Sequence, residues 1–190
     1  MTSIIKVDTI QSAAGSTVLE QTNATTITLG STGQTILLNA NATNNFAVNT
    51  PAFEAKQSSS QSLTSDTYTK INFDTERFDT DSTYASSRFT PAVAGKYFIY
   101  SSVCLTPGNQ TDWAYGNIAI YKNGVEYGNN LFDARGSLVF RAFLSIARTI
   151  DFNTTDYVEI YARLTADDGA GVSIQDTNGN CFGGYKIIGA

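Results

Sequence analysis

The stretch KYFIYSSVCL, at residues 96–105, decides the fold class of this chain. On an extended chain its side chains divide into two alternating sets. One face carries Tyr97, Ile99, Ser101, Val103 and Leu105, and the other carries Phe98, Tyr100, Ser102 and Cys104. A period of two with aromatic and β-branched enrichment is typical of a strand within a sheet.

Three further segments predict strands by the same alternation: residues 137–148, 157–164 and 185–188. The side chains expected to point inward are Leu138, Phe140, Ala142, Leu144 and Ile146 in the first segment, and Val158, Ile160, Ala162 and Leu164 in the second. A buried helix is the alternative for 137–148. Between strands, Asn123-Gly124 predicts a two-residue hairpin turn, because this pair supplies the positive φ angles of a type I′ turn. Many short strands separated by turns predict an all-β sandwich or jelly roll.

The aromatic residues divide the chain into two parts. Only one of them, Phe46, precedes residue 52. We therefore predict a compact knob over residues 52–190 and a separate anchoring segment and stem over residues 1–51.

The amino-terminal part carries a short apolar repeat. The repeated pairs are Ile27 with Leu29, Ile36 with Leu38, and Phe46 with Val48. A short strand that buries alternate side chains, repeated along an axis, is typical of a β-rich fibrous stem in which neighbouring chains complete the core. These residues, Val48 excepted, are our predicted stem contacts between subunits. A Thr- and Asn-rich linker with chance alternation is the alternative.

Charge and composition exclude several functions. The net charge is −5 and the 12 Lys and Arg residues are scattered, so we expect no nucleic-acid partner. The chain has no His, the commonest general base and zinc ligand, so we expect neither catalysis nor a cofactor. Neither a signal peptide nor a membrane-spanning run is visible.

Five acidic residues are weak candidates for chemistry. Asp167 with Asp168, or Asp79 with Asp81, could form a carboxylate pair for glycoside hydrolysis. Asp167 and Asp168 could also bind calcium together with Asp176. Solvated turns explain these residues better. Similarly, Cys104 and Cys181 are expected to be buried free thiols, with a disulfide as the alternative.

Four motifs of the knob resemble, in order, the globular head of complement component q and its tumour necrosis factor relatives. They are YTKINFD at residues 68–74, RFTPAVAGKYF at 88–98, IYKNG at 120–124 and FGGY at 182–185. The resemblance implies a jelly roll that assembles as a homotrimer, with Phe182 and Tyr100 at the subunit interface. A core position is the alternative for each ring. The chain has no collagen-like stem, so the complement function is not carried over.

The amino terminus resembles tail-fibre-like structural proteins of phages of cyanobacteria and other aquatic bacteria. The similar residues are 3–11 and 13–15, and their apolar side chains Ile4, Ile5 and Val7 suit insertion beside a sheet edge of another virion protein. This resemblance implies a location in the virion.

Loops at the far end of the knob would then be free to bind a host glycan or protein. The side chains suited to such contacts are Trp113, Tyr115, Tyr127 and Arg135. Core packing is the alternative for Trp113 and Tyr115. We thus predict a short trimeric fibre or spike, with a capsid decoration protein as the alternative and a glycan-degrading enzyme as a remote one.

Overall fold

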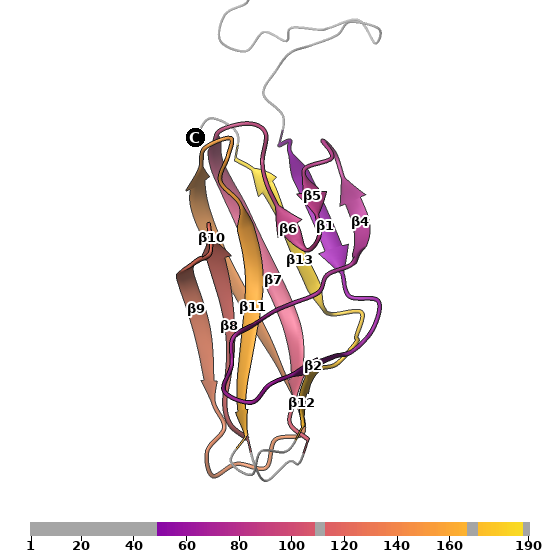
Figure 1. Cartoon of the computed structure of the whole chain (residues 1–190), viewed down its shortest axis with the longest axis vertical. Coiled ribbons are helices and arrows are strands. Elements are labelled where there is room, and N and C mark those ends of the chain that lie inside the picture. The colour runs from indigo at the N-terminus through magenta and orange to yellow at the C-terminus, as the bar shows by residue number, and fades with distance from the viewer. Residues whose placement is uncertain (1–48, 109–112, 167–170, 188–190) are drawn as a thin grey trace, which may run out of the picture. The chain divides into compact units, whose positions relative to one another are not determined.

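In the computed structural model, residues 49–108, 113–166 and 171–187 are described, and their regular structure consists only of β-strands (Figure 1). The strands form two sheets. Sheet A contains β1 (Ala52–Lys56), β2 (Gln61–Leu63), β4 (Thr75–Asp79), β7 (Gly95–Thr106), β10 (Ala142–Phe152), β12 (Val172–Ile174) and β13 (Cys181–Lys186). Sheet B contains β3 (Thr69–Lys70), β5 (Tyr84–Ala85), β6 (Arg88–Phe89), β8 (Trp113–Lys122), β9 (Val125–Asp133) and β11 (Val158–Ala166).

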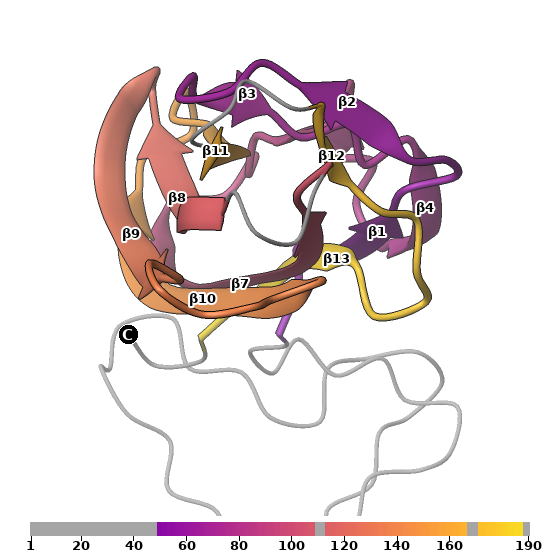
Figure 2. The same ribbon diagram turned by 90° about the horizontal axis from the view of Figure 1, so that it is seen from below.

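The two sheets form an antiparallel sandwich, seen end-on in Figure 2. Sheet A has the order β2-β12-β7-β13-β1-β4, and β10 also pairs with β7. Sheet B has the order β5-β6-β11-β8-β9, and β3 also pairs with β11. The predicted all-β jelly-roll class is therefore confirmed for the knob.

Strand β7 has the two faces that its sequence predicts. Tyr97, Ile99 and Val103 are fully buried between the sheets, whereas Phe98 and Tyr100 on the opposite face are partly exposed. The Tyr97 hydroxyl donates to the Val93 carbonyl at 2.7 Å, and burial raises the pKa of Tyr97 to about 12. The inward set of β11 is also confirmed, because Val158, Ile160, Ala162 and Leu164 are all fully buried.

The predicted hairpin joins β8 to β9. Its two central residues have positive φ angles, 53° at Asn123 and 78° at Gly124, as a type I′ turn requires. The carboxylate of Asp156 ties this turn to the loop before β11. It accepts from Asn123 Nδ2 at 2.7 Å and from the Asn153 amide at 2.9 Å, and it pairs with Lys122 Nζ at 2.8 Å.

Two predicted strand boundaries are wrong. The strand predicted to begin at residue 137 begins at Ala142, and Leu138 and Phe140 are 72 % and 68 % exposed rather than inward. Residue 142 pairs with Leu105, next to the last residue of β7, so earlier residues have no strand to pair with. The last strand runs over Cys181–Lys186 instead of 185–188.

The predicted stem and anchor lie outside the described residues. This applies to the anchor residues Ile4, Ile5 and Val7 and to the stem contacts Ile27, Leu29, Ile36, Leu38 and Phe46. None of the described residues forms a helix long and apolar enough to cross a membrane.

Candidate functional site

The outer face of sheet A carries five aromatic side chains, which we call the aromatic face. They are Phe78 on β4, Phe98 and Tyr100 on β7, Phe143 on β10 and Tyr185 on β13. The ring of Phe98 lies 5.6 Å from that of Tyr185 and 6.1 Å from that of Tyr100, centroid to centroid. Phe143 is 54 % exposed and Phe78 is 49 % exposed. Exposed aromatic residues gathered on one sheet face are typical of an interaction surface.

A polar contact line crosses the aromatic face. The Tyr100 hydroxyl donates to Glu54 Oε2 at 2.6 Å, and Arg77 Nη1 pairs with Glu54 Oε1 at 2.5 Å. Gly183 makes the first of these contacts sterically feasible, because a Cβ there would lie 2.5 Å from both Cζ and Oη of Tyr100. The Tyr100 ring therefore lies over Gly183 of β13, and burial together with the Glu54 hydrogen bond raises the pKa of its hydroxyl.

The predicted interface residue Phe182 is in the core instead. Its side chain is fully buried within the single chain, with the rings of Phe53, Phe73 and Tyr84 at 4.9, 5.7 and 5.9 Å. A ring with no exposed surface cannot contact another subunit, so that prediction is wrong. Tyr100, the second predicted residue, lies on the opposite face of sheet A, where it is partly exposed.

Trp113 is also a core residue. It is 2 % exposed, and its ring contacts that of Phe132 at 5.5 Å. The prediction that it contacts a receptor is therefore wrong, and the alternative of core packing holds. Gly116 provides the space for this ring, because a Cβ there would lie 2.8 Å from Trp113 Cζ2.

The other three predicted contact residues lie nearer the surface. Tyr127 on β9 is 48 % exposed, and Tyr115 on β8 is half-buried. The Arg135 guanidinium lies 4.7 Å from the Tyr115 ring centroid and pairs with Asp133 at 2.7 Å. Their role in recognition stays a prediction.

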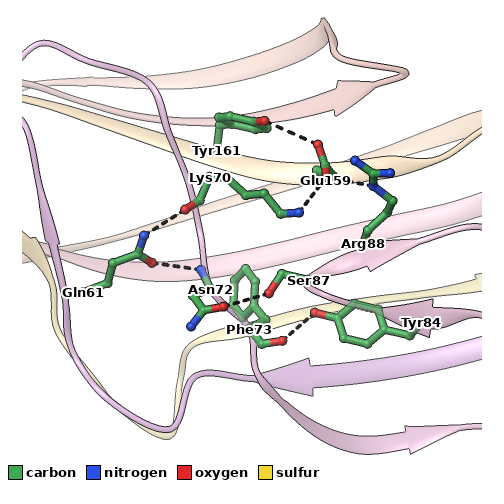
Figure 3. A network of polar contacts seen from close by, with 9 residues as sticks. All are labelled: Gln61, Lys70, Asn72, Phe73, Tyr84, Ser87, Arg88, Glu159 and Tyr161. Atoms are coloured by element: carbon green, nitrogen blue, oxygen red, sulfur yellow. Dashed lines mark hydrogen bonds and ion pairs between the residues drawn. The ribbon is translucent and has the colours of Figure 1, made fainter.

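A buried carboxylate organises the outer face of sheet B (Figure 3). Glu159 on β11 is 3 % exposed, yet it points to the polar side of the strand. Its Oε1 accepts from Lys70 Nζ at 2.6 Å and from Arg88 Nε at 2.9 Å. Burial raises the pKa of Glu159, but the two cationic donors outweigh burial and leave the pKa below its usual value. The three residues thus join β3, β6 and β11 by charge-assisted hydrogen bonds.

Beside this network lies a pocket of about 560 Å³, which we call the hairpin pocket because the β5–β6 hairpin forms part of its wall. Its lining residues are Lys70, Asp81, Ser82, Thr83, Ala85, Ser86, Arg88, Thr90 and Ala92. Seven of these nine residues carry a hydroxyl or a charged group.

Comparison with known proteins shows which solved structures share this fold. No family model and no curated protein matches the chain, but many solved structures do. The knob has a jelly-roll fold similar to that of tumour necrosis factor domains. Murine APRIL matches with 11 % identity and a TM-score of 0.53, over 72 % of this chain and 98 % of that one. Eiger TNF from S. frugiperda matches with 10 % identity and a TM-score of 0.52, over 73 % and 93 %.

The globular domain of zebrafish complement 1qA is similar at 15 % identity, with a TM-score of 0.49 over 72 % of this chain and 97 % of that one. The matches to murine APRIL and Eiger TNF, with TM-scores of 0.53 and 0.52, confirm the fold implied by the four sequence motifs. Phe89, Tyr97 and Phe182 from these motifs are all fully buried in the core, and Asn123-Gly124 forms a turn. The motifs thus specify the sandwich itself.

The remaining predicted sites divide by position. Asp167 and Asp168 lie outside the described residues, and Asp176 is exposed. Asp79 caps a turn, because its carboxylate accepts from the Tyr84 amide at 2.8 Å. Across the described residues, no group of three His, Cys, Asp or Glu side chains is placed to hold a metal ion. Cys104 and Cys181 are free thiols, as predicted; Cys104 is buried, whereas Cys181 is only partly buried.

Sequence reasoning missed the Glu159 network and the hairpin pocket. Lys70 and Arg88 lie 89 and 71 residues before Glu159, so no local spacing brings them together. The one available signal was an acidic residue, Glu159, between the apolar residues Val158 and Ile160.

Proposed function

We propose that the chain is a non-catalytic homotrimeric binding protein, a short fibre or spike of a bacteriophage particle. Its amino-terminal segment would anchor it to another virion protein, and its knob would contact the host surface. The observation that carries the proposal is the aromatic face, which the single chain leaves exposed to water.

Further copies of the chain are the occupants best suited to the aromatic face. The face lies on paired strands, with β13 between β7 and β1, so it offers ring surfaces instead of free backbone groups. Aromatic side chains are enriched in the core of subunit interfaces. The trimer as the expected stoichiometry comes from the resemblance of the knob motifs to a trimeric family.

The phage context is supported by the amino-terminal residues. Their resemblance to tail-fibre-like proteins and their short apolar repeat both fit an anchored stem. The absence of His from the whole sequence supports a binding role over catalysis.

The oligomeric state tests the proposal directly. Light scattering of the full chain should give three times the chain mass of 20.4 kDa. Tyr185→Glu should shift this mass toward that of the monomer, because it places a charge in the aromatic face. Tyr127→Glu is the matched control, since Tyr127 is 48 % exposed on β9 in sheet B and its substitution should leave the trimer intact. A wild-type monomer at micromolar concentration would refute the proposal.

The virion role needs a separate experiment. A chain that lacks residues 1–48 should remain a folded trimer and should no longer join the particle. The deletion spares the contacts of β1, including the hydrogen bond from the Ala52 amide to Thr80 Oγ1 at 3.0 Å. Antibody labelling of intact particles should mark the tail or its fibres. Label at capsid three-fold positions would instead identify a decoration protein.

A further inference from the structure

We propose that the hairpin pocket binds a saccharide residue that carries a negatively charged group, either a carboxylate or a sulfate ester. The inference gives a place and a ligand class to the recognition role of the knob, and it rests on that proposed role.

The size and lining of the pocket suit a sugar. Its volume of about 560 Å³ falls within the range of small-molecule sites. The hydroxyl-bearing residues Ser82, Thr83, Ser86 and Thr90 line it together with Asp81, and of these hydroxyls that of Thr83 donates to Asp79 Oδ1 at 3.2 Å. Hydroxyls both donate and accept, and a carboxylate accepts from the hydroxyls of a ligand. Ala85 and Ala92 complete the lining, and their small side chains fill little of the pocket volume.

Arg88 is held in one orientation for an anion. Its Nε donates to the buried Glu159 at 2.9 Å, and its guanidinium lies 3.9 Å from the centroid of the Tyr157 ring. These two contacts fix the plane of the guanidinium and leave its terminal nitrogens without a hydrogen-bond partner among the described residues. A fixed guanidinium edge matches a carboxylate or a sulfate with two parallel hydrogen bonds.

The placement of the charges suits an acidic ligand, although their sum is zero. Lys70 and Arg88 carry two positive charges, and the buried Glu159 and the lining residue Asp81 carry two negative ones, so the edge of the Arg88 guanidinium would hold the anion. The ammonium of Lys70 uses one of its three donors on Glu159 and can offer the others to a ligand. Asp81 makes no side-chain hydrogen bond among the described residues, so its carboxylate remains available for sugar hydroxyls.

The turn of the β5–β6 hairpin has serine at positions whose positive φ angles favour glycine. Ser86 and Ser87, between β5 and β6, have φ angles of 52° and 58°. A left-handed conformation costs a residue other than Gly about 1 kcal/mol or more. Ser87 uses its hydroxyl on Asn72 Oδ1 at 3.2 Å, whereas the Ser86 hydroxyl lines the pocket and has no described partner. A ligand contact of Ser86 would account for the hydroxyl.

The test is calorimetric titration of the full chain with three matched trisaccharides, which are built from galacturonic acid, from sulfated galactose and from neutral galactose. We expect binding of the carboxylated or the sulfated trisaccharide, with the neutral one bound at least tenfold more weakly. Comparison of the two acidic trisaccharides identifies whether the pocket prefers a carboxylate or a sulfate ester. Arg88→Lys should weaken this binding about tenfold, because it keeps the charge on Glu159 but removes the bidentate edge. Asp81→Asn should weaken it severalfold, and Asp151→Asn, at an exposed aspartate that does not line the pocket, is the matched control.

Ser86→Gly separates recognition from stability. Because glycine accepts the positive φ angle, the variant should melt at the wild-type temperature or above it and should still bind the acidic sugar less tightly, by about two- to tenfold. Unchanged affinity in Arg88→Lys, Asp81→Asn and Ser86→Gly, or equal affinity for neutral and acidic sugars, would overturn the proposal. A trimer that binds no acidic sugar refutes the pocket alone, whereas a monomer that binds it refutes the trimer and keeps the pocket.

Discussion

Truncation of Phe182 should destabilise the fold without acting on assembly directly. The ring is fully buried and lies within 5.9 Å of the rings of Phe53, Phe73 and Tyr84, centroid to centroid. Phe182→Ala would leave a cavity lined by three aromatic rings, and such a change costs about 3–5 kcal/mol of unfolding free energy. For a domain of this size the melting temperature should fall by about 10 °C.

Tyr185→Ala is the matched control on the same strand. Tyr185 points to the aromatic face, where it is 38 % exposed and contacts Phe98 at 5.6 Å. Its loss should cost about 1 kcal/mol within a single chain. The assays are denaturant unfolding over a series of protein concentrations and light scattering. Our reasoning fails if Phe182→Ala unfolds like the wild type but loses the trimer, because the ring would then belong to a subunit interface.

Three further changes test other contacts. Gly183→Ala should destabilise the knob by about 1–3 kcal/mol and weaken self-association. The new Cβ would lie 2.5 Å from the Tyr100 ring and would displace it. Gly171→Ala is the control and should have neither effect, because nothing lies within 4 Å of its Cβ. Hydrogen bonds from Lys122, Asn153 and Asn123 lower the pKa of Asp156 below 3.8, so its stabilisation is present above that pH and is lost on acidification. Thermal melts should therefore show Asp156→Asn less stable than the wild type at pH 7, with a smaller difference at pH 3. Burial raises the pKa of both cysteine thiols, so alkylation at pH 7 should be slow until denaturant is added, and slowest at the buried Cys104. Rapid alkylation of Cys104 in the native chain would contradict its burial.

The sequence predicted the central strands correctly where both of their faces carry information. In β7 the inward residues Tyr97 and Ile99 alternate with the outward Phe98 and Tyr100, and the structure keeps this alternation. The same rule failed at Leu138 and Phe140, which alternate but precede the first residue of β10. Alternation shows that an extended chain would have one apolar and one polar face. A strand also needs a neighbouring strand to pair with, and alternation carries no information about that neighbour.

The last strand was misplaced for a different reason. Gly183 and Gly184 weaken the strand signal, since glycine has a low propensity for strands. In the structure they lie within β13, where a Cβ at Gly184 would come 2.6 Å from Ile99 Cδ1. The glycines thus serve close packing against β7, which becomes visible only once the two strands are paired.

The candidate site was beyond sequence reasoning because long-range pairing creates it. Glu159 occupies an outward position on β11, where a solvated carboxylate is the ordinary expectation. It becomes buried because β3 pairs with β11 at Tyr161↔Lys70, and β6 pairs with it at Val158↔Phe89. These two registers bring Lys70 and Arg88 to the same carboxylate oxygen. A buried carboxylate that has lost its water needs both cations, and this requirement holds the Arg88 guanidinium beside the pocket in a fixed orientation. The contact that stabilises this side of the sandwich therefore also prepares the group that would recognise an acidic ligand.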